Sequence, residues 1–189
     1  MHIKDKVFIV TGAGSGLGAG TTRELIDQGA RVVMADINDA DANHLAESLG
    51  PQATYIKTDV TSPDDAAAVV NFATKTFGGL NGLINCAGVA ISERVVGRDG
   101  PHRLESFART VTVNLIGTFN MTRLAAAAMA MNEPDADGER GVIVNTASIA
   151  AFDGQIGQAA YAASKAGVAG MTLPLARERS ARNTTSSGR

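Results

Sequence analysis

The chain has few cysteines and little net charge, the two features that would indicate an oxidising compartment or a charged partner. Among its 189 residues there is one cysteine, Cys86, which cannot form an internal disulfide. The fold therefore does not depend on an oxidising environment. Opposite charges nearly cancel, with 19 Asp and Glu against 17 Lys and Arg. A net charge of −2 provides no basic surface for nucleic acid or for an anionic membrane, so both are excluded as partners.

Long apolar runs are also missing. No stretch of the sequence reaches the roughly 18 residues of a membrane-spanning helix. The first apolar run, residues 7–11, follows Lys4 and Lys6 and is too short for the core of a secretory signal. No small-residue cleavage site comes after it. We therefore expect a cytoplasmic protein.

Short apolar runs alternate with helical stretches from the N-terminus onward. Continuous apolar runs are typical of strands that are buried on both faces of a sheet. The expected strands are residues 7–11, 31–35, 54–57, 80–86 and 141–147, and the expected helices are 16–29, 40–49, 63–77, 104–131 and 161–177. This alternation favours right-handed crossovers and a parallel sheet covered on both faces. The sequence thus predicts an α/β domain over residues 1–176, a doubly wound parallel sheet of the Rossmann type.

Glycine is abundant, and five of the 21 glycines fall where the first strand passes into the first helix. A tight turn there requires residues without a Cβ, and a helix N-terminus offers amide groups and partial positive charge to a pyrophosphate. A G-x-G-x-x-A pattern from Gly14 begins late relative to the strand. The register Thr11-Gly12-x-x-x-Gly16-x-Gly18 begins at the strand end and fits better. We interpret the segment as a pyrophosphate loop, the alternative being a flexible loop without a ligand.

Asp36 ends the second expected strand, 18 residues after Gly18. A carboxylate at this spacing accepts hydrogen bonds from the ribose diol of adenosine and repels a 2′-phosphate. Neither position 36 nor 37 is basic. The pattern predicts NAD rather than NADP as the cofactor. The alternative is an ordinary helix-capping aspartate.

Three further polar positions suggest chemistry. Tyr161 and Lys165 are four residues apart on an expected helix, so they share a face, and a cation beside a phenol favours the phenolate. Such a pair suits general acid–base catalysis. Ser148 follows the fifth expected strand, at the carboxyl edge where doubly wound folds bind ligands. Asn114 is polar within an apolar helical stretch, where a capping or kink residue is the alternative interpretation.

Taken together, these residues look like the short-chain dehydrogenase/reductase family. The resemblance is carried by residues 11–18, by Asn85-Cys86-Ala87-Gly88, and by Asn114, Ser148 and Tyr161-x-x-x-Lys165, all in the family's order. It implies that Tyr161 is the catalytic acid and base and that Lys165 favours its ionised form and holds the nicotinamide ribose. Ser148 would polarise the substrate oxygen, and Asn114 would support a water-linked proton relay.

The resemblance also implies a set of contacts to NAD. Ala87 and Gly88, with Asn85, would line the adenosine side, and Asp59 would contact the adenine ring. The expected cofactor-binding residues are Gly12, Ser15, Gly16, Leu17, Gly18, Asp36, Asp59, Val60, Asn85, Ala87, Gly88, Tyr161 and Lys165. Cys86 replaces the second Asn of the family's Asn-Asn-Ala-Gly segment, and an apolar thiol is tolerable at the end of a buried strand.

Longer stretches of the sequence narrow the family resemblance to one subfamily. Residues 95–107, 131–146 and 151–158 resemble type-2 3-hydroxyacyl-CoA dehydrogenases. That resemblance implies oxidation of a 3-hydroxyacyl-CoA or another secondary alcohol by NAD, a place in fatty acid metabolism and a homo-oligomer, dimer or tetramer, if the fold is complete. Arg94, Arg98 and Arg103 would meet CoA phosphates, or are ordinary charges of an exposed loop.

No metal is expected. His2, His44 and His102 are scattered and lack partners at metal-ligand spacing. Asp135, Asp137 and Glu139 form an acidic segment, for which a solvated connection is favoured over a cation loop.

The last part of the sequence departs from the family. Residues 177–189 contain no apolar residue larger than Ala181, which predicts a fraying helix end and a polar, disordered tail. The resemblance implies that the family's C-terminal strands are absent, so that the fifth strand leaves an apolar edge and the substrate lacks a cover. Two hypotheses follow: an NAD-dependent secondary-alcohol dehydrogenase, or a shortened, catalytically incompetent form that binds NAD or serves as an oligomer partner.

Overall fold

The computed structural model describes residues 2–98 and 100–184. The chain groups into two compact units, which are treated separately. The first contains residues 1–88 and 116–146, and the second contains residues 89–115 and 147–189. The prediction of one domain over residues 1–176 stays a prediction.

The first unit is built on a five-stranded parallel sheet with the order β3-β2-β1-β4-β7. The strands are β1 (Val7–Thr11), β2 (Arg31–Asp36), β3 (Ala53–Lys57), β4 (Gly82–Asn85) and β7 (Val142–Asn145). All five residues of β1 are buried, as its continuous apolar sequence predicts. The chain order and the parallel pairing confirm the predicted Rossmann-type sheet.

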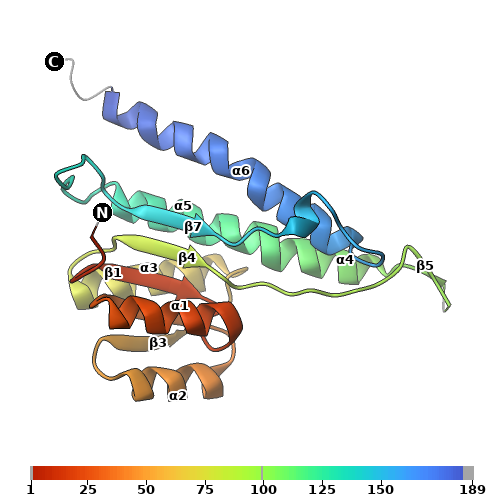
Figure 1. Ribbon diagram of the computed structural model, residues 1–189, viewed down its shortest axis with the longest axis horizontal. Helices are drawn as coiled ribbons and strands as arrows, with labels where there is room; N and C mark the ends of the chain where they lie inside the picture. Colours follow the sequence, from red (N-terminus) through yellow and green to blue (C-terminus); the bar gives the residue numbers. More distant parts are fainter. Residues whose placement is uncertain (1, 99, 185–189) are drawn as a thin grey trace. The chain divides into compact units, whose positions relative to one another are not determined.

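Four helices pack against this sheet. They are α1 (Gly16–Asp27), α2 (Asp39–Leu49), α3 (Pro63–Phe77) and α5 (Thr118–Met129). Figure 1 shows α1 in front of the sheet and α3 behind it. The start of α3 is set by its own sequence, since the Ser62 hydroxyl accepts a hydrogen bond from the Asp65 amide (3.2 Å) and Pro63 occupies the first turn.

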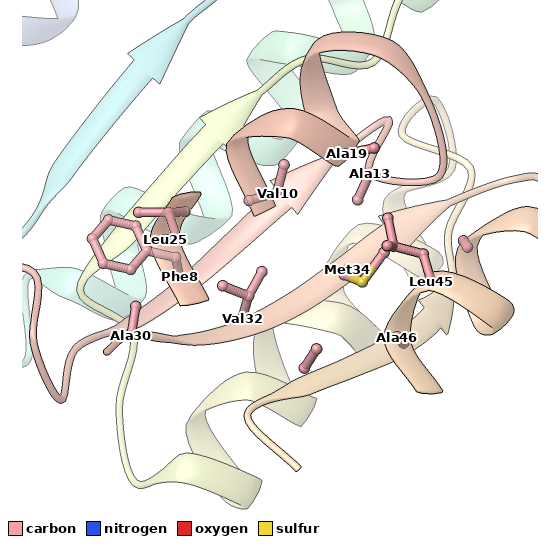
Figure 2. Packing of buried hydrophobic residues seen from close by; sticks show 12 residues of the cluster. Phe8, Val10, Ala13, Ala19, Leu25, Ala30, Val32, Met34, Leu45 and Ala46 are labelled. Carbon is pink, nitrogen blue, oxygen red and sulfur yellow. The ribbon is translucent and has the colours of Figure 1, made fainter. Parts of the chain in front are cut away.

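One hydrophobic core cluster of this unit lies between the sheet and α1 and α2. Figure 2 shows Phe8 and Val10 from β1 beside Val32 and Met34 from β2, with Leu25 of α1 over them. All five side chains are buried. A Cβ at position 82 would run into the ring of Phe8, so the glycine in β4 allows the ring to lie against the neighbouring strand.

Removing the Phe8 ring should strongly destabilise the protein. Phe8 is 2% exposed, so Phe8→Ala leaves a cavity that the parallel sheet cannot close, at an expected cost of about 3–5 kcal/mol in the free energy of unfolding. Urea unfolding followed by circular dichroism measures it. Phe152, which is 86% exposed, provides the matched control, and its replacement by alanine should cost less than about 0.5 kcal/mol. Equal losses in the two variants would contradict this account of the core.

Over its described residues, the second unit consists of an extended stretch and several helical segments. It contains the short hairpin β5 (Val96–Gly97) and β6 (Gly100–Pro101), the helix α4 (Leu104–Val111), the 3₁₀ turn η2 (Ile149–Ala151) and the helix α6 (Ala159–Thr184). α6 packs against α4 and η2. Gly167 permits a close approach within this unit, because a Cβ there would lie 2.7 Å from Leu115 Cδ2.

The predicted helix over residues 104–131 was wrong in one respect. A π-helical segment, η1 (Thr112–Gly117), separates α4 from α5. Such segments form where local contacts override the regular i to i−4 ladder, and they are frequent at functional sites. Gly117 lies against Val60, since a Cβ at 117 would come 2.6 Å from Val60 Cγ2. Helical periodicity alone does not reveal this widening.

The remaining differences lie in the loops and at the C-terminus. The hairpin of β5 and β6 was not predicted, because Gly97 and Gly100 favoured an irregular loop. α6 continues to Thr184, beyond the expected helix end near residue 177. The remainder of the predicted tail, residues 185–189, lies outside the described residues. Over the part of the chain that the structure describes, no helix is long and apolar enough to cross a bilayer.

Candidate active site

The predicted pyrophosphate loop joins β1 to α1 and closely approaches the end of β4. Gly12 has a φ of +64°, and a Cβ there would lie 2.8 Å from the backbone N and Cα of Ala87. A Cβ at Gly18 would collide with the carbonyl oxygen of Gly12. Both positions therefore require glycine for steric reasons. The loop ends at Ser15, the N-cap residue of α1, so the first amides of that helix lie beside it.

Thr11 links the ends of β1 and β4. Its hydroxyl oxygen accepts hydrogen bonds from the amides of Cys86 and Ala87, both at 3.1 Å. These bonds place Ala87 against Gly12, and Gly88 follows directly in the chain. Thr11 was read as part of the loop motif and was not among the predicted site residues. The signal that could have identified Thr11 as a site residue was its position at the end of a buried strand.

The carboxylate of Asp36 faces the glycine loop. Its Oδ2 accepts a hydrogen bond from the Gly14 amide (2.8 Å), and its Oδ1 accepts one from the Asn38 amide (2.9 Å). The N-cap residue of α2 is Asn38, so Asp36 is not the cap of that helix. The half-buried Asp36 thus places its carboxylate at the carboxyl edge of the sheet, next to the glycine loop, and its role toward the ribose diol stays a prediction.

Asp59, the predicted adenine contact, and Val60, a predicted cofactor residue, lie on the turn that follows β3. Asp59 Oδ1 accepts hydrogen bonds from the amide and hydroxyl of Thr61 at 2.9 and 2.8 Å. The Asp59 amide donates to Asp65 Oδ2 at 2.9 Å. Asn120 Nδ2 donates to the carbonyl oxygen of Val60 at 2.9 Å. The turn is therefore anchored to both α3 and α5, and the cofactor roles of Asp59 and Val60 stay predictions.

Asn85 is a buried member of the predicted cofactor set. It is 3% exposed, and its Nδ2 donates to Asn145 Oδ1 (2.9 Å) and to the Thr122 hydroxyl (3.2 Å). These bonds connect β4 with β7 and α5. Asn85 thus braces the sheet beneath the loop, and its predicted place beside the adenosine stays a prediction.

Asn114 organises the second unit. Its side chain is fully buried in η1. Asn114 Oδ1 accepts from the Val89 amide (2.8 Å), while Nδ2 donates to the Val89 carbonyl (2.9 Å) and to the Ser164 hydroxyl (3.0 Å). Ser164 in turn donates to the carbonyl oxygen of Tyr161 (2.7 Å). One amide therefore ties the start of the extended stretch to the turn of α6 that bears Tyr161.

Tyr161 and Lys165 lie on consecutive turns of α6, as their spacing predicts. The Lys165 ammonium lies 5.8 Å from the centroid of the Tyr161 ring. Lys165 is 5% exposed, so its charge is held in a largely desolvated place, whereas Tyr161 is half-buried. Ser164, between them in the sequence, was not predicted as part of the site. Its link to Asn114 depends on tertiary structure.

Ser148 is the N-cap residue of η2. Its Oγ accepts a hydrogen bond from the Ala150 amide at 3.2 Å. A hydroxyl that accepts one bond still has its own hydrogen to donate. The second unit thus contains all four residues predicted to be catalytic: Asn114, Ser148, Tyr161 and Lys165.

The loop arginines do not form one group. Arg94 and Arg98 line an open hollow of about 430 Å³ on the β5–β6 hairpin. Arg103 is paired with Glu93 instead, with its Nη2 3.2 Å from Glu93 Oε2. The structure therefore separates Arg103 from the predicted phosphate-binding set.

The acidic segment of residues 135–139 forms a turn. The ligand oxygens of Asp135, Asp137 and Glu139 lie within 4.8 Å of one another. Asp135 Oδ1 accepts the amides of Glu139 (2.8 Å) and Asp137 (3.0 Å), and the Glu139 amide is the main cause that lowers the pKa of Asp135. Its carboxylate is thus engaged in stabilising the turn.

Comparison with known proteins shows to which protein family this chain belongs. The sequence matches the short chain dehydrogenase family over residues 6–186. The chain belongs to this family. It is 51% identical to 3-hydroxyacyl-CoA dehydrogenase type-2 of Drosophila melanogaster and 46% identical to that of Homo sapiens. Each match spans 178 residues and 93% of this chain, covering 70% of the fly protein and 68% of the human protein.

Solved structures agree with this assignment. The crystal structure of 3-hydroxyacyl-CoA dehydrogenase type-2 from Mycobacterium avium matches with a TM-score of 0.90 at 41% identity, over 96% of this chain and 72% of that one. A short chain dehydrogenase from Mycobacterium smegmatis matches with a TM-score of 0.85 at 30% identity. The predicted family, fold class and enzyme class, a dehydrogenase similar to type-2 3-hydroxyacyl-CoA dehydrogenases, are confirmed.

Proposed function

We propose that this short-chain dehydrogenase transfers hydride between a secondary alcohol, a 3-hydroxyacyl-CoA, and NAD. The observation that carries the proposal is the grouping of Asn114, Ser148, Tyr161 and Lys165 in one compact unit, with Asn114 linked to the Tyr161 turn through Ser164. The similarity to type-2 3-hydroxyacyl-CoA dehydrogenases supports the substrate class.

The residues of the first unit fit NAD. The glycine loop leaves no room for a Cβ at Gly12 and ends at the N-terminus of α1, where helix amides favour a pyrophosphate. Gly16, Leu17 and Gly18 would hold it with Ser15. Asp36 has a carboxylate at the loop and no basic neighbour at position 37, which favours a ribose diol. Asp59, Val60, Asn85, Ala87 and Gly88 would complete the adenosine side. When bound, NAD would supply the hydride acceptor.

The residues of the second unit would manage the proton. Tyr161 would accept the proton of the substrate hydroxyl as hydride leaves the carbinol carbon. Lys165, desolvated near the ring, would stabilise the phenolate form of Tyr161, which receives this proton and becomes the phenol, and would also bind the nicotinamide ribose. Ser148 would donate a hydrogen bond to the substrate oxygen with the hydrogen it retains. Asn114 would hold the carbonyl of Val89 and the Tyr161 turn in place for a water-linked proton relay.

The function is tested by mixing the protein with NAD and 3-hydroxybutyryl-CoA and following NADH absorbance. Turnover is expected, and butyryl-CoA, which lacks the hydroxyl group, should give none. Absence of turnover together with measurable NAD binding would contradict the proposal. That outcome would support the second candidate, a form that binds NAD without catalysis.

One observation favours this second candidate. β7 ends the sheet, and its Val142 and Val144 are 37% and 47% exposed. Near Ser148 in the sequence, Ile149, Phe152 and Ile156 are 79–86% exposed, so this side of the second unit is open. These apolar surfaces also support the proposal that the chain is a homo-oligomer, a dimer or tetramer. The proposed location in the cytoplasm rests on the sequence alone.

A further inference from the structure

Glu93 connects two parts of the second unit through its backbone. It lies in the extended stretch that precedes β5, and its amide donates a hydrogen bond to the carbonyl oxygen of Gly157 at 2.9 Å. Gly157 has a φ of +84°, and a Cβ there would lie 2.7 Å from Ser92 Oγ. The two segments therefore touch at a point where only glycine fits.

The side chain of Glu93 reaches a third segment, the N-terminus of α4. Arg103 is the N-cap residue of this helix, with the extended backbone of a cap (φ −70°, ψ 124°), but it makes no side-chain cap bond. Arginine carries no acceptor. Glu93 Oε1 instead accepts the Arg103 amide at 2.7 Å, and Ser106 also donates to the carboxylate. Glu93 thus supplies the cap that the helix's own sequence lacks.

Charges around the carboxylate reinforce this link. The guanidinium of Arg103 supplies the opposite charge, with Nη2 3.2 Å from Oε2. The imidazole of His102 lies beside the carboxylate, with Nδ1 3.9 Å from Oε1. The Arg103 amide and then its guanidinium lower the pKa of Glu93 from 4.5 to about 2. The carboxylate is therefore ionised at neutral pH. Glu105, in the first turn of α4, also favours the charged form of Arg103.

The segment that Glu93 holds lies between two proposed catalytic residues in the chain. Residues 152–158 connect η2, which begins after Ser148, with α6, which bears Tyr161. Gln158 accepts the Ala162 amide at 2.7 Å in the first turn of α6. Phe152 and Ile156 of this segment are more than 80% exposed, so its few anchoring bonds matter for its placement.

We propose that Glu93 is a positioning residue for the substrate: by joining the N-terminus of α4 to Gly157, it fixes the 152–158 loop between Ser148 and Tyr161. This role rests on the proposed function, because it assumes that those two residues contact the substrate. It concerns substrate binding and not the cofactor loop, whose residues belong to the other unit.

Glu93→Ala tests the proposal. The substitution keeps the backbone amide that bonds Gly157 and removes only the carboxylate that anchors residue 93 to α4. Without that anchor the 152–158 loop should be held less firmly, so KM for 3-hydroxybutyryl-CoA should rise about tenfold with kcat reduced less than about threefold, the pattern expected when binding is lost equally in the ground and transition states. The Kd of NADH should stay within about twofold. Glu105→Ala, which removes the neighbouring carboxylate of α4, is the matched control and should leave KM unchanged.

A double variant separates positioning from helix capping. Glu93→Ala with Arg103→Thr gives α4 a cap of its own, so Tm should return to the wild-type value. KM should remain raised, since residue 93 still lacks the carboxylate that anchors it, and with it the 152–158 loop, to α4. Recovery of both quantities would overturn the proposal, because Glu93 would then act only as a cap.

Hydrogen exchange provides a readout that needs no turnover. In Glu93→Ala the amides of residues 92–95 and 155–158 should exchange faster, while those of β1 are unchanged. Unaltered exchange in these segments would overturn the proposal whether or not the wild-type chain oxidises the thioester. If exchange is faster in Glu93→Ala but the wild-type chain shows no turnover, the inference about Glu93 stands and the proposed function is refuted. The Kd of acetoacetyl-CoA is then measured in place of KM. An unchanged Kd would overturn the positioning role.

Discussion

Tyr161→Phe should reduce kcat by about 10²- to 10⁴-fold, the range expected when a general acid–base group is lost. The substitution removes only the phenol oxygen. The ring remains near Lys165, and the bond from Ser164 goes to the backbone carbonyl of residue 161, so the turn of α6 keeps its anchor. Steady-state NADH production at saturating NAD and 3-hydroxybutyryl-CoA measures the loss.

The chain offers a matched control for this substitution, because it contains two tyrosines. The Tyr55 hydroxyl donates to Asp39 Oδ1 and to the Asp36 carbonyl in the first unit. Tyr55→Phe should leave kcat within about twofold at saturating NAD. The Kd of NADH should stay largely unchanged in Tyr161→Phe, because only the phenol oxygen is removed. Retention of more than a tenth of kcat in Tyr161→Phe would remove this residue from its acid–base role.

Asp36→Ala should raise the Kd of NAD about 10- to 100-fold, since hydrogen bonds to a charged group contribute roughly 1.5–3 kcal/mol and each 1.4 kcal/mol is a factor of ten. The Kd of NADP should change less than about threefold, because loss of the carboxylate also removes repulsion from a 2′-phosphate. Titration calorimetry with both nucleotides gives the two constants.

NADP serves as an internal control for the shape of the loop. Asp36 also accepts the Gly14 amide, so a collapse of the glycine loop would weaken both nucleotides equally. Equal weakening would show that Asp36 acts on the loop and not on the ribose. Asp64→Ala, which removes an exposed carboxylate from the first turn of α3, should change neither constant.

Much of the fold could be predicted because its signals are local. β1 is five consecutive buried residues, and a continuous apolar run of that length is typical of a parallel strand covered on both faces. Ser62 and Pro63 mark the start of α3 within its own sequence. The π-helical segment η1 could not be predicted in this way, since its apolar sequence follows ordinary helical periodicity, and the bond of its buried Asn114 to Val89 joins residues 25 positions apart in the chain.

The residues of the candidate site also divide into those that local sequence predicts and those that it does not. Gly12 and the Tyr161–Lys165 pair were visible because a turn and a helix repeat impose their spacing. The roles of Thr11, Ser164 and Glu93 were not visible. Thr11 bonds to Cys86 and Ala87 across 75 and 76 residues, and Ser164 meets Asn114 across 50. The position of a hydroxyl or carboxylate in the sequence does not reveal which distant residue will become its hydrogen-bond partner after folding.

The sequence by itself determined the alternation of strands and helices, the steric need for glycine after β1, and the shared face of Tyr161 and Lys165, because each depends on residues within a few positions of one another. Only the tertiary structure decided that Asn114 holds the Tyr161 turn through Ser164 and that Glu93 caps α4 from another segment. These contacts form when buried polar groups must find partners away from water. The topology of the chain determines which residues become partners, and the local sequence around each polar group does not.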